Sequence, residues 1–316
     1  MTTILEINEL SVDFFSDGEL TNSALRGLNL KVNAGETLGI VGETGCGKTL
    51  TGMAIMGLLP PNAVRRGDIK FAEFGVLAPE KMSKLRGSEI SVIFQNPHSA
   101  FNPVFTIGDQ LRLVARKQGM KKGDSEDLLI SQLRSVGLRE PQRVLSSYPH
   151  QLSGGMLQRC MIAMALISKP KLLIADEPTT ALDSTVGQQV LELIKTLQVE
   201  EKFAMIFISH DVEVVSEISD DIAVLYAGKV VEYGPSEEVM RRSVHPYTRG
   251  LLGAIPSADK KRGQLASIPG NVPANTLAIV GCSFADRCSS RFEACDVEPQ
   301  MRSFQNRNVA CWKAHQ

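Results

Sequence analysis

Glu-Thr-Leu-Gly-Ile-Val-Gly-Glu-Thr-Gly-Cys-Gly-Lys-Thr, residues 36–49, joins a short apolar run to a glycine-rich loop. The run from Glu36 to Val41 is typical of a buried strand. Residues 49–59 are predicted to form a helix that ends before Pro60-Pro61. Strand, loop and helix in this order match the pattern G-x-x-x-x-G-K-[ST] of a phosphate-binding loop. The stretch therefore predicts an α/β nucleotide-binding fold.

The residues of this loop have separate predicted parts in binding phosphate. The glycines allow backbone N–H groups to turn toward phosphate oxygens, Lys48 is expected to reach the β and γ oxygens, and the Thr49 hydroxyl to ligate Mg²⁺. The nucleotide-binding residues are Gly42, Glu43, Thr44, Gly45, Cys46, Gly47, Lys48 and Thr49. We interpret Cys46 as a small packed side chain. The alternative is an alkylation-sensitive thiol, activated by the surrounding backbone donors.

A second stretch, Leu-Leu-Ile-Ala-Asp-Glu at 172–177, ends an apolar run with two acids. Two adjacent carboxylates at a buried strand end are costly to desolvate without a cation. We therefore predict that Asp176 holds Mg²⁺ and that Glu177 polarises the attacking water. A solvated pair of turn residues is the alternative. Together with the loop, this stretch indicates an NTPase.

Three further polar residues stand at the ends of predicted elements. Gln95 follows an apolar strand and could reach the metal or the water, while beginning a helical insert. His210 follows the apolar run 204–208, where a contact with the γ-phosphate could form, although a structural histidine is the alternative. Asp183 either belongs to the site or caps the following helix.

Residues 152–156, Leu-Ser-Gly-Gly-Met, form a second potential anion-binding element. A Ser-Gly-Gly turn that opens a helix directs backbone N–H groups at an anion. One nucleotide has no obvious use for two such elements. We therefore expect Ser153, Gly154, Gly155 and Met156 to act in a site completed by a partner chain.

Composition excludes several classes of protein. The chain has 316 residues, 43 % of them hydrophobic, and a formal charge of -1, so it lacks the basic surplus of a nucleic-acid-binding protein. It has no apolar run of about 18 residues and no signal-peptide pattern at its N-terminus. We expect a cytosolic α/β protein that binds no nucleic acid.

The pattern along the chain predicts two domains, 1–244 and 245–316. Within the first, residues 96–160 are expected to form a mainly helical insert, and the apolar runs 172–175 and 204–208 to be central parallel strands of a mixed sheet. Residues 222–234 are predicted to form a terminal hairpin. Beyond His245-Pro246-Tyr247, proline and glycine become frequent, which predicts a loop-rich appendage.

Four of the six cysteines fall in the last 35 residues, namely Cys282, Cys288, Cys295 and Cys311. In a reducing compartment this enrichment favours a metal over disulfides. The spacing lacks the paired C-x-x-C of zinc fingers, and four thiolates could equally hold a [4Fe-4S] cluster. Free thiols are the third possibility.

Taken together, these motifs resemble those of the ATP-binding cassette family, in family order across about 230 residues. The match consists of Walker A (42–49), the Q-loop Gln95, the signature (152–156), Walker B (172–177), the D-loop (180–183) and the switch His210. The resemblance implies a P-loop NTPase fold with a mixed sheet and a helical subdomain, and ATP with Mg²⁺ held by Thr49, Gln95 and Asp176. It implies catalytic roles for Glu177, His210 and Gln95, and adenine stacking on Phe14 or Phe15. It also implies a head-to-tail dimer in which Ser153 and Gly155 face the γ-phosphate held by Lys48 of the other protomer.

The chain further resembles the oligopeptide and dipeptide importer branch, which includes nickel importers. The similar stretches are Val-Ile-Phe-Gln-Asn-Pro at 92–97, the segment from Phe101 to Gln110, Ile-Ala-Asp-Glu-Pro-Thr-Thr-Ala-Leu-Asp at 174–183, His-Pro-Tyr-Thr-Arg-Gly-Leu-Leu at 245–252 and the cysteine tail. The resemblance implies an ATPase subunit for peptide uptake that pairs with a homologous cassette. It also implies two membrane permease subunits, an extracytoplasmic solute-binding protein and a peripheral place on the cytoplasmic face of the inner membrane. Members of this branch carry such cysteines, which favours the [4Fe-4S] cluster over zinc.

Two residues depart from the family pattern. Leu157 stands where a basic residue is expected, which could alter contacts around the nucleotide of the partner, and Thr44 replaces a commoner serine. A soluble cassette ATPase acting on ribosomes or DNA would carry two cassettes or a coiled-coil insertion. An exporter would more often be fused to membrane helices. Neither feature is present in the sequence, so the importer subunit is the preferred interpretation.

Overall fold

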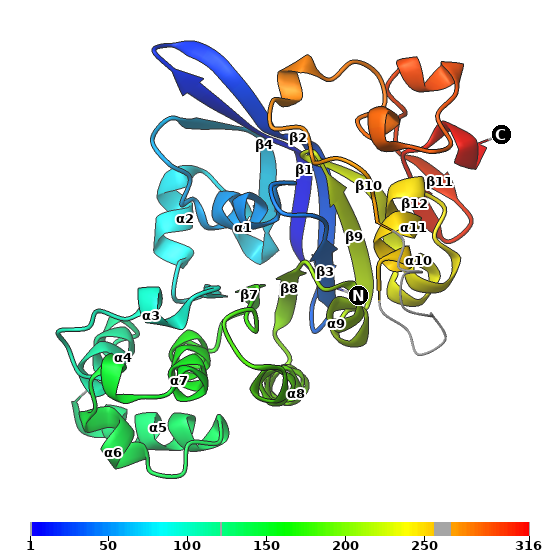
Figure 1. The fold of residues 1–316 in the computed structure, drawn as a ribbon. Helices are drawn as coiled ribbons and strands as arrows, with labels where there is room; N and C mark the ends of the chain where they lie inside the picture. The colour runs from blue at the N-terminus through cyan, green and yellow to red at the C-terminus, as the bar shows by residue number, and fades with distance from the viewer. Residues whose placement is uncertain (1, 121, 256–266, 316) are drawn as a thin grey trace. The chain divides into compact units, whose positions relative to one another are not determined.

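The computed structural model of the chain describes residues 2–120, 122–255 and 267–315. They form two compact units, one made of residues 1–79 and 207–316 and the other of residues 80–206 (Figure 1). Within the described ranges, no helix has both the length and the apolar character that crossing a membrane requires.

The first unit contains an antiparallel sheet of four strands in the order β2-β1-β4-β5. Its strands are β1 (Thr3–Ser16), β2 (Glu19–Asn33), β4 (Ala63–Phe71) and β5 (Gly75–Val76). In β2, the buried Leu28, Leu30 and Val32 alternate with exposed residues. Because successive side chains of a strand point to opposite faces, this alternation places one face of the sheet on the core.

The second sheet of this unit is mixed, as the sequence predicts. Its strands within the unit are β3 (Thr37–Val41), β9 (Asp221–Tyr226), β10 (Lys229–Pro235), β11 (Arg302–Phe304) and β12 (Arg307–Val309). β3 pairs with β9 in parallel, and β9 pairs with β10 antiparallel. All five residues of β3 are buried, which accounts for its continuous apolar sequence.

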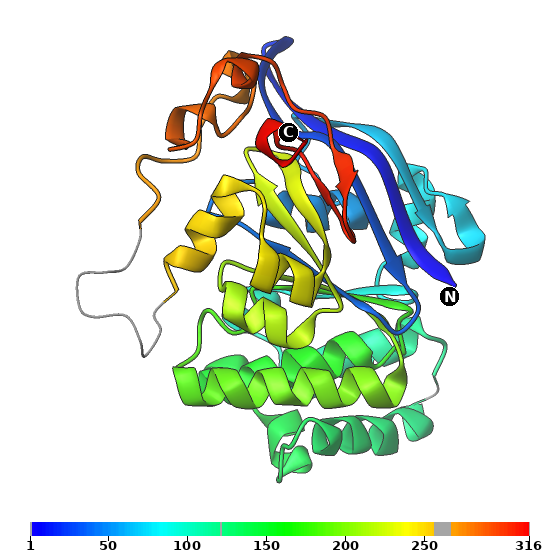
Figure 2. The same cartoon turned by 90° about the vertical axis from the view of Figure 1, so that its right-hand side faces the viewer.

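The predicted hairpin over 222–234 is confirmed, and it turns at Ala227 and Gly228. Both residues have positive φ, 46° and 76°, which is the conformation of a tight hairpin turn. The hairpin is not the edge of the sheet, however, because β12 pairs with β10 and β11 pairs with β12. The C-terminal part of the chain, predicted to be rich in loops, thus adds two strands to the sheet (Figure 2).

The helices of the first unit are α1 (Lys48–Met56), α9 (Val212–Ile218), α10 (Ser236–Arg242) and α11 (Pro246–Gly253). α1 ends at Met56 and not at the predicted Leu59. Gly57 adopts the left-handed conformation there, and its N–H donates to the Ala54 carbonyl at 3.2 Å. Such a glycine stops a helix because the next residues leave the helical path.

The second unit combines two parallel strands, β6 (Ile90–Ile93) and β7 (Leu172–Asp176), with a group of helices. β8 (Ala204–Ser209) crosses the boundary between the units. The helix α2 also crosses it, because its first residue, Pro79, belongs to the first unit. The helices are α2 (Pro79–Leu85), α3 (Pro97–Ala100), α4 (Ile107–Lys117), α5 (Lys122–Ser135), α6 (Pro141–Ser146), α7 (Gly154–Leu166) and α8 (Ser184–Glu201). The prediction that residues 96–160 are mainly helical is therefore confirmed, because α3 to α6 and the first part of α7 lie in this range.

The insert has its own apolar core. In α4, the fully buried Ile107, Leu111 and Ala115 are four residues apart and form one helix face. Leu129 and Leu133 of the neighbouring α5 have the same spacing and are also fully buried. Packing of these faces holds the helices together, as expected for amphipathic helices.

Candidate nucleotide site

The phosphate loop follows β3 and bends through backbone conformations that only glycine adopts readily. Gly42, Gly45 and Gly47 have φ of 156°, 84° and 110°. A Cβ atom on Gly42 would lie 2.3 Å from the carbonyl oxygen of Leu225 in β9. These glycines therefore allow the loop to turn closely against the sheet before α1 begins.

Lys48 and Thr49 stand in the first turn of α1, where the sequence predicts them. Lys48 is only 6 % exposed, and its Nζ donates to the carbonyl oxygens of Gly42 at 2.8 Å and Glu43 at 3.1 Å. The ammonium group is thereby held over the loop. Thr49 is exposed. This arrangement is suited to holding phosphate with the lysine and a metal with the threonine.

Cys46 is a packed residue of the loop. It is fully buried, and burial raises the pKa of its thiol to about 11. Since the thiolate is the reactive form, this favours the interpretation as a small packed side chain over an alkylation-sensitive thiol. The Cys46 carbonyl accepts a hydrogen bond of 2.9 Å from the Gly228 N–H, which ties the loop to the hairpin turn.

The same unit contains the other residues predicted to contact ATP. Phe14 and Phe15 are both half-buried at the end of β1. Their exposure therefore does not show which of them would stack on the adenine ring. His210 is exposed and directly follows β8. The turn around it is fixed because Ser209 Oγ accepts from the Asp211 N–H at 3.0 Å and Asp211 caps α9.

Sequence inspection missed a set of contacts that the C-terminal part makes with Glu43. The Tyr247 hydroxyl accepts a hydrogen bond of 2.8 Å from the Glu43 N–H. Arg287 donates to both carboxylate oxygens of Glu43, from Nη1 at 2.6 Å and from Nη2 at 2.9 Å. Arg287 is 244 positions from Glu43 in sequence, and no motif links them. The only sequence signal near these contacts is the His-Pro-Tyr segment at 245–247, which contains Tyr247.

That His-Pro-Tyr segment is fixed by buried polar groups. Glu232 on β10 accepts hydrogen bonds from the N–H groups of Val244 at 2.9 Å and His245 at 3.1 Å. His245 Nδ1 accepts from the Tyr247 N–H at 3.1 Å and so begins α11. Burial lowers the pKa of His245 to about 3, which keeps the imidazole neutral and able to accept this bond.

In the second unit, the structure brings Gln95 and Glu177 together. They follow the parallel strands β6 and β7, and Gln95 Nε2 donates to Glu177 Oε2 at 3.2 Å. The Thr180 hydroxyl donates to the same oxygen at 2.9 Å. Glu177 has a φ of 47°, a strained conformation for a residue with a side chain, whereas Asp176 still belongs to β7. The carboxylate of Glu177 is thus aimed by its backbone and by two donors.

The signature residues open α7 as predicted. Ser153 is the exposed N-cap residue, and its Oγ accepts from the Met156 N–H at 3.3 Å. Gly154 and Gly155 form the first helical residues, and a Cβ atom on Gly155 would lie 2.7 Å from Val186 Cγ1 of α8. The glycine thus permits close packing against α8.

Leu157 has a structural explanation. The sequence suggested that this residue could alter contacts around the nucleotide of a partner, but its side chain is fully buried within the second unit. It is a core residue of α7. The following Gln158 is also buried, and its Nε2 donates to the Pro178 carbonyl at 2.7 Å, which ties α7 to the turn after β7.

Asp183 is the N-cap residue of α8. Its Oδ1 accepts from the Val186 N–H at 3.0 Å, so the capping alternative is observed. Capping accounts for an aspartate at this place without a contact to nucleotide.

Of the four C-terminal cysteines, Cys295 lies in the 3₁₀ segment η5 (Glu293–Asp296). Cys282 and Cys288 flank η4 (Ala285–Arg287), and Cys311 directly precedes η6 (Trp312–His315). The Cys282 N–H donates to the Cys295 carbonyl at 2.8 Å. Burial, and then the thiols of Cys295, Cys311 and Cys288, raise the pKa of Cys282 to about 11. In the described part of the chain, no group of three His, Cys, Asp or Glu side chains has the arrangement of a metal site.

Comparison with known proteins identifies the family. Residues 25–180 match the family described as ABC transporter, and residues 231–295 match the family described as oligopeptide/dipeptide transporter, C-terminal region. The chain is 43 % identical over 319 residues to the dipeptide transport ATP-binding protein DppD of Bacillus subtilis, covering 99 % of this chain and 95 % of that protein. It is 43 % identical over 315 residues to the oligopeptide transport ATP-binding protein OppD of Salmonella typhimurium, covering 98 % and 93 %.

A solved structure supports the same assignment. The chain resembles the ATP-binding cassette MJ0796, solved as a dimer in a post-hydrolysis state bound to ADP and Pi. The TM-score is 0.64 at 26 % identity, over 74 % of this chain and 99 % of the other. The chain therefore belongs to the ABC transporter family and is one of its ATPases.

Proposed function

We propose that the chain energises the uptake of dipeptides, oligopeptides or a related small solute as the ATP-hydrolysing subunit of a binding-protein-dependent importer. One observation carries this proposal: the chain resembles two peptide-transport ATP-binding proteins along almost its whole length, including their C-terminal region. A cassette for another purpose would be expected to share only the ATPase part. Residues 1–244 are the proposed ATPase domain and 245–316 the proposed extension, although the match to the C-terminal family already begins at residue 231.

The proposed assembly contains a homologous second cassette, two membrane permease subunits and an extracytoplasmic solute-binding protein. The chain would be a peripheral protein on the cytoplasmic face of the inner membrane. ATP would bind between two cassettes, with the exposed Ser153 and the glycines after it facing the γ-phosphate held by the other cassette. Closure on ATP and reopening after hydrolysis would drive the permease by a conformational cycle.

The proposed chemistry assigns a role to each motif residue of the site. Lys48 would stabilise the β and γ oxygens of bound ATP, and Thr49, Asp176 and Gln95 are the residues that would hold Mg²⁺, which would neutralise charge on the phosphates. Glu177 polarises the water that attacks the γ-phosphorus, and the bond to the β-γ bridging oxygen breaks to give ADP and phosphate. His210 contacts the γ-phosphate. The hydrogen bond from Gln95 to Glu177 supports this scheme, because it orients the carboxylate.

For the cysteine segment we propose a bound [4Fe-4S] cluster, with a zinc ion as the alternative. The support is that four cysteines fall in the last 35 residues and that the Cys282 N–H donates to the Cys295 carbonyl at 2.8 Å, which brings two of the proposed ligands together. Thiolates brought together in this way are stabilised by a cation, which would also help to fold a segment built of short 3₁₀ turns. The ligands would be Cys282, Cys288, Cys295 and Cys311.

Co-purification tests the importer assignment. The tagged chain, expressed with its native partners, should purify from detergent-solubilised membranes with two permease subunits and a second cassette. A chain that is never recovered with permease subunits would contradict the proposal. Visible absorption and iron content after anaerobic purification test the cluster. Iron near four atoms per chain supports it, zinc supports the alternative, and the absence of both supports free thiols.

A further inference from the structure

Glu43, the second residue of the phosphate loop, has every polar group engaged by protein. Its N–H donates to Tyr247, its side chain accepts from Arg287, and its carbonyl accepts from Lys48 Nζ at 3.1 Å. The carbonyl also accepts from the Cys46 N–H at 3.3 Å. Glu43 thus connects the C-terminal extension with Lys48 and the backbone of the phosphate loop.

Arg287 is held rigidly in the place from which it reaches Glu43. Its side chain is 7 % exposed, against 27 % for Glu43. Its Nε donates to the Pro269 carbonyl at 2.7 Å, and its guanidinium lies over the ring of Tyr226 at 5.7 Å. The planar guanidinium matches a carboxylate with two parallel bonds, and such charge-assisted pairs are the stronger hydrogen bonds of proteins. The pair is therefore built into the fold and is unlike a mobile surface ion pair.

Tyr247 is held in a similar way. It is fully buried and packs edge-on against Tyr226, with ring centroids 4.6 Å apart, and against Phe284 at 5.3 Å. Burial raises the pKa of its hydroxyl, which stays protonated and keeps its lone pairs available to the Glu43 N–H. This aromatic group joins β9, α11 and η4 under the start of the loop.

A carboxylate in a phosphate loop opposes the binding of ATP. The triphosphate carries several negative charges, and an uncompensated carboxylate in the same loop, which is only partly exposed, repels them. Arg287 supplies the compensating positive charge, while Tyr247 fixes the backbone on the other side of Glu43. The sequence shows the glutamate but not the arginine that neutralises it.

We propose that Arg287 and Tyr247, both in the C-terminal extension, are positioning residues for ATP binding. Arg287 neutralises the Glu43 carboxylate and Tyr247 holds the Glu43 backbone, so that the phosphate loop accepts the anionic nucleotide. This assigns the extension a direct part in nucleotide affinity. The inference rests on the ATPase activity of the cassette and not on the identity of the transported solute.

The test compares KM for ATP and kcat in the assembled transporter carrying R287Q, E43Q or both substitutions. R287Q should raise KM by about tenfold or more, with a smaller effect on kcat, because it leaves the carboxylate uncompensated. The double variant R287Q/E43Q should recover most of the lost affinity, since no charge remains to repel ATP. Equal KM values for R287Q and the double variant, or an unchanged KM in R287Q, would overturn the proposal.

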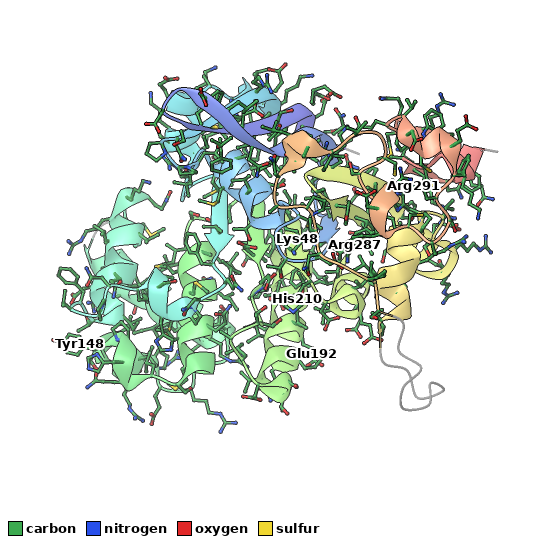
Figure 3. All side chains as sticks on the ribbon, turned by 45° about the horizontal axis from the view of Figure 1, so that its top comes forward. Lys48, Tyr148, Glu192, His210, Arg287 and Arg291 are labelled. Carbon is green, nitrogen blue, oxygen red and sulfur yellow. The ribbon has the colours of Figure 1, made fainter. Side chains whose placement is uncertain are left out.

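Two further measurements separate positioning from a merely structural role. Raising the salt concentration should reduce the KM defect of R287Q, because salt screens the repulsion; a defect that is independent of salt contradicts the charge argument. R291Q is the matched control, since Arg291 is a neighbouring arginine that pairs with Asp286 and Asp296 and not with the loop (Figure 3). It should leave KM unchanged.

R287K and Y247F keep the test decisive if R287Q does not assemble. R287K retains the charge without the paired geometry and should give an intermediate KM, relieved again by E43Q. Y247F removes the acceptor of the Glu43 N–H and should raise KM several-fold. A transporter with these ATP kinetics but without peptide uptake would contradict the proposed function and leave this inference intact.

Discussion

Gln95 donates a hydrogen bond of 3.2 Å to Glu177, and the two residues follow adjacent parallel strands. The carboxyl ends of parallel strands lie at the same edge of a sheet, where the α/β folds place their ligands. The first helix of the insert, α3, starts two residues after Gln95. The contact therefore connects the insert directly to the carboxylate that is proposed to polarise water. A change in the insert can therefore alter the position of Glu177.

The first prediction concerns Glu177 itself. Glu177→Gln should lower ATP turnover by about 10²- to 10⁴-fold, because the amide cannot polarise water, while ATP binding is retained. An ATP-bound dimer should accumulate, which size-exclusion chromatography with radiolabelled ATP detects. Glu192→Gln is the control, since Glu192 is an exposed carboxylate of α8 (Figure 3). Turnover equal to the parent in Glu177→Gln would exclude this role.

The second prediction concerns the contact with Gln95. Gln95→Ala removes a donor to the carboxylate and should reduce turnover by about tenfold, less than the loss in Glu177→Gln. Combining both changes should cost little more than Glu177→Gln alone, because the two residues act as a unit. Independent, multiplied losses in the double variant would show that Gln95 acts elsewhere.

The third prediction tests the packing of the signature helix. Gly155→Ala should destabilise the protein by about 1–3 kcal/mol, because the new methyl group would lie 2.7 Å from Val186 Cγ1. Val186→Ala in the same chain should recover part of the loss, as thermal unfolding can measure. In Gly154→Ala, the nearest atom would be Leu182 Cδ2 at 3.7 Å, an ordinary contact. If the two alanine variants are equally stable, the packing argument is wrong.

The sequence predicts the loop, the hairpin, the helical insert and the start of α7, because local patterns decide these elements. The hairpin turn needs positive φ at Ala227 and Gly228, and the signature helix starts where Ser153 can cap it. The contacts of Glu43 could not be predicted, since they depend on how segments 204 and 244 positions away pack on the loop. The pairing of β12 with β10 was missed for the same reason, because a three-residue strand has too little pattern of its own.

The fourth prediction uses the buried His245. Its pKa is lowered from 6.5 to about 3 by burial, so the unfolded chain binds a proton at higher pH than the folded one. The stabilisation from neutral His245 is therefore complete above about pH 6.5 and is lost as the pH falls toward 3, at up to about 1.4 kcal/mol per pH unit. Urea unfolding at several pH values should show this slope.

His245→Asn supplies the comparison for that measurement. Asparagine can cap α11 but does not titrate in this range, so the slope of the unfolding free energy between pH 6 and 4 should decrease by about one proton. The same slope in both proteins would mean that other groups cause the acid sensitivity.

Uptake by the reconstituted transporter tests the central claim most directly. The chain, its companion cassette and the permease subunits are placed in liposomes with ATP on the cassette side, and the solute-binding protein with a labelled peptide library is placed on the other. The account predicts ATP-dependent transfer of peptides to the cassette side, which stops with Glu177→Gln. Steady ATP hydrolysis without transfer of any peptide would contradict it.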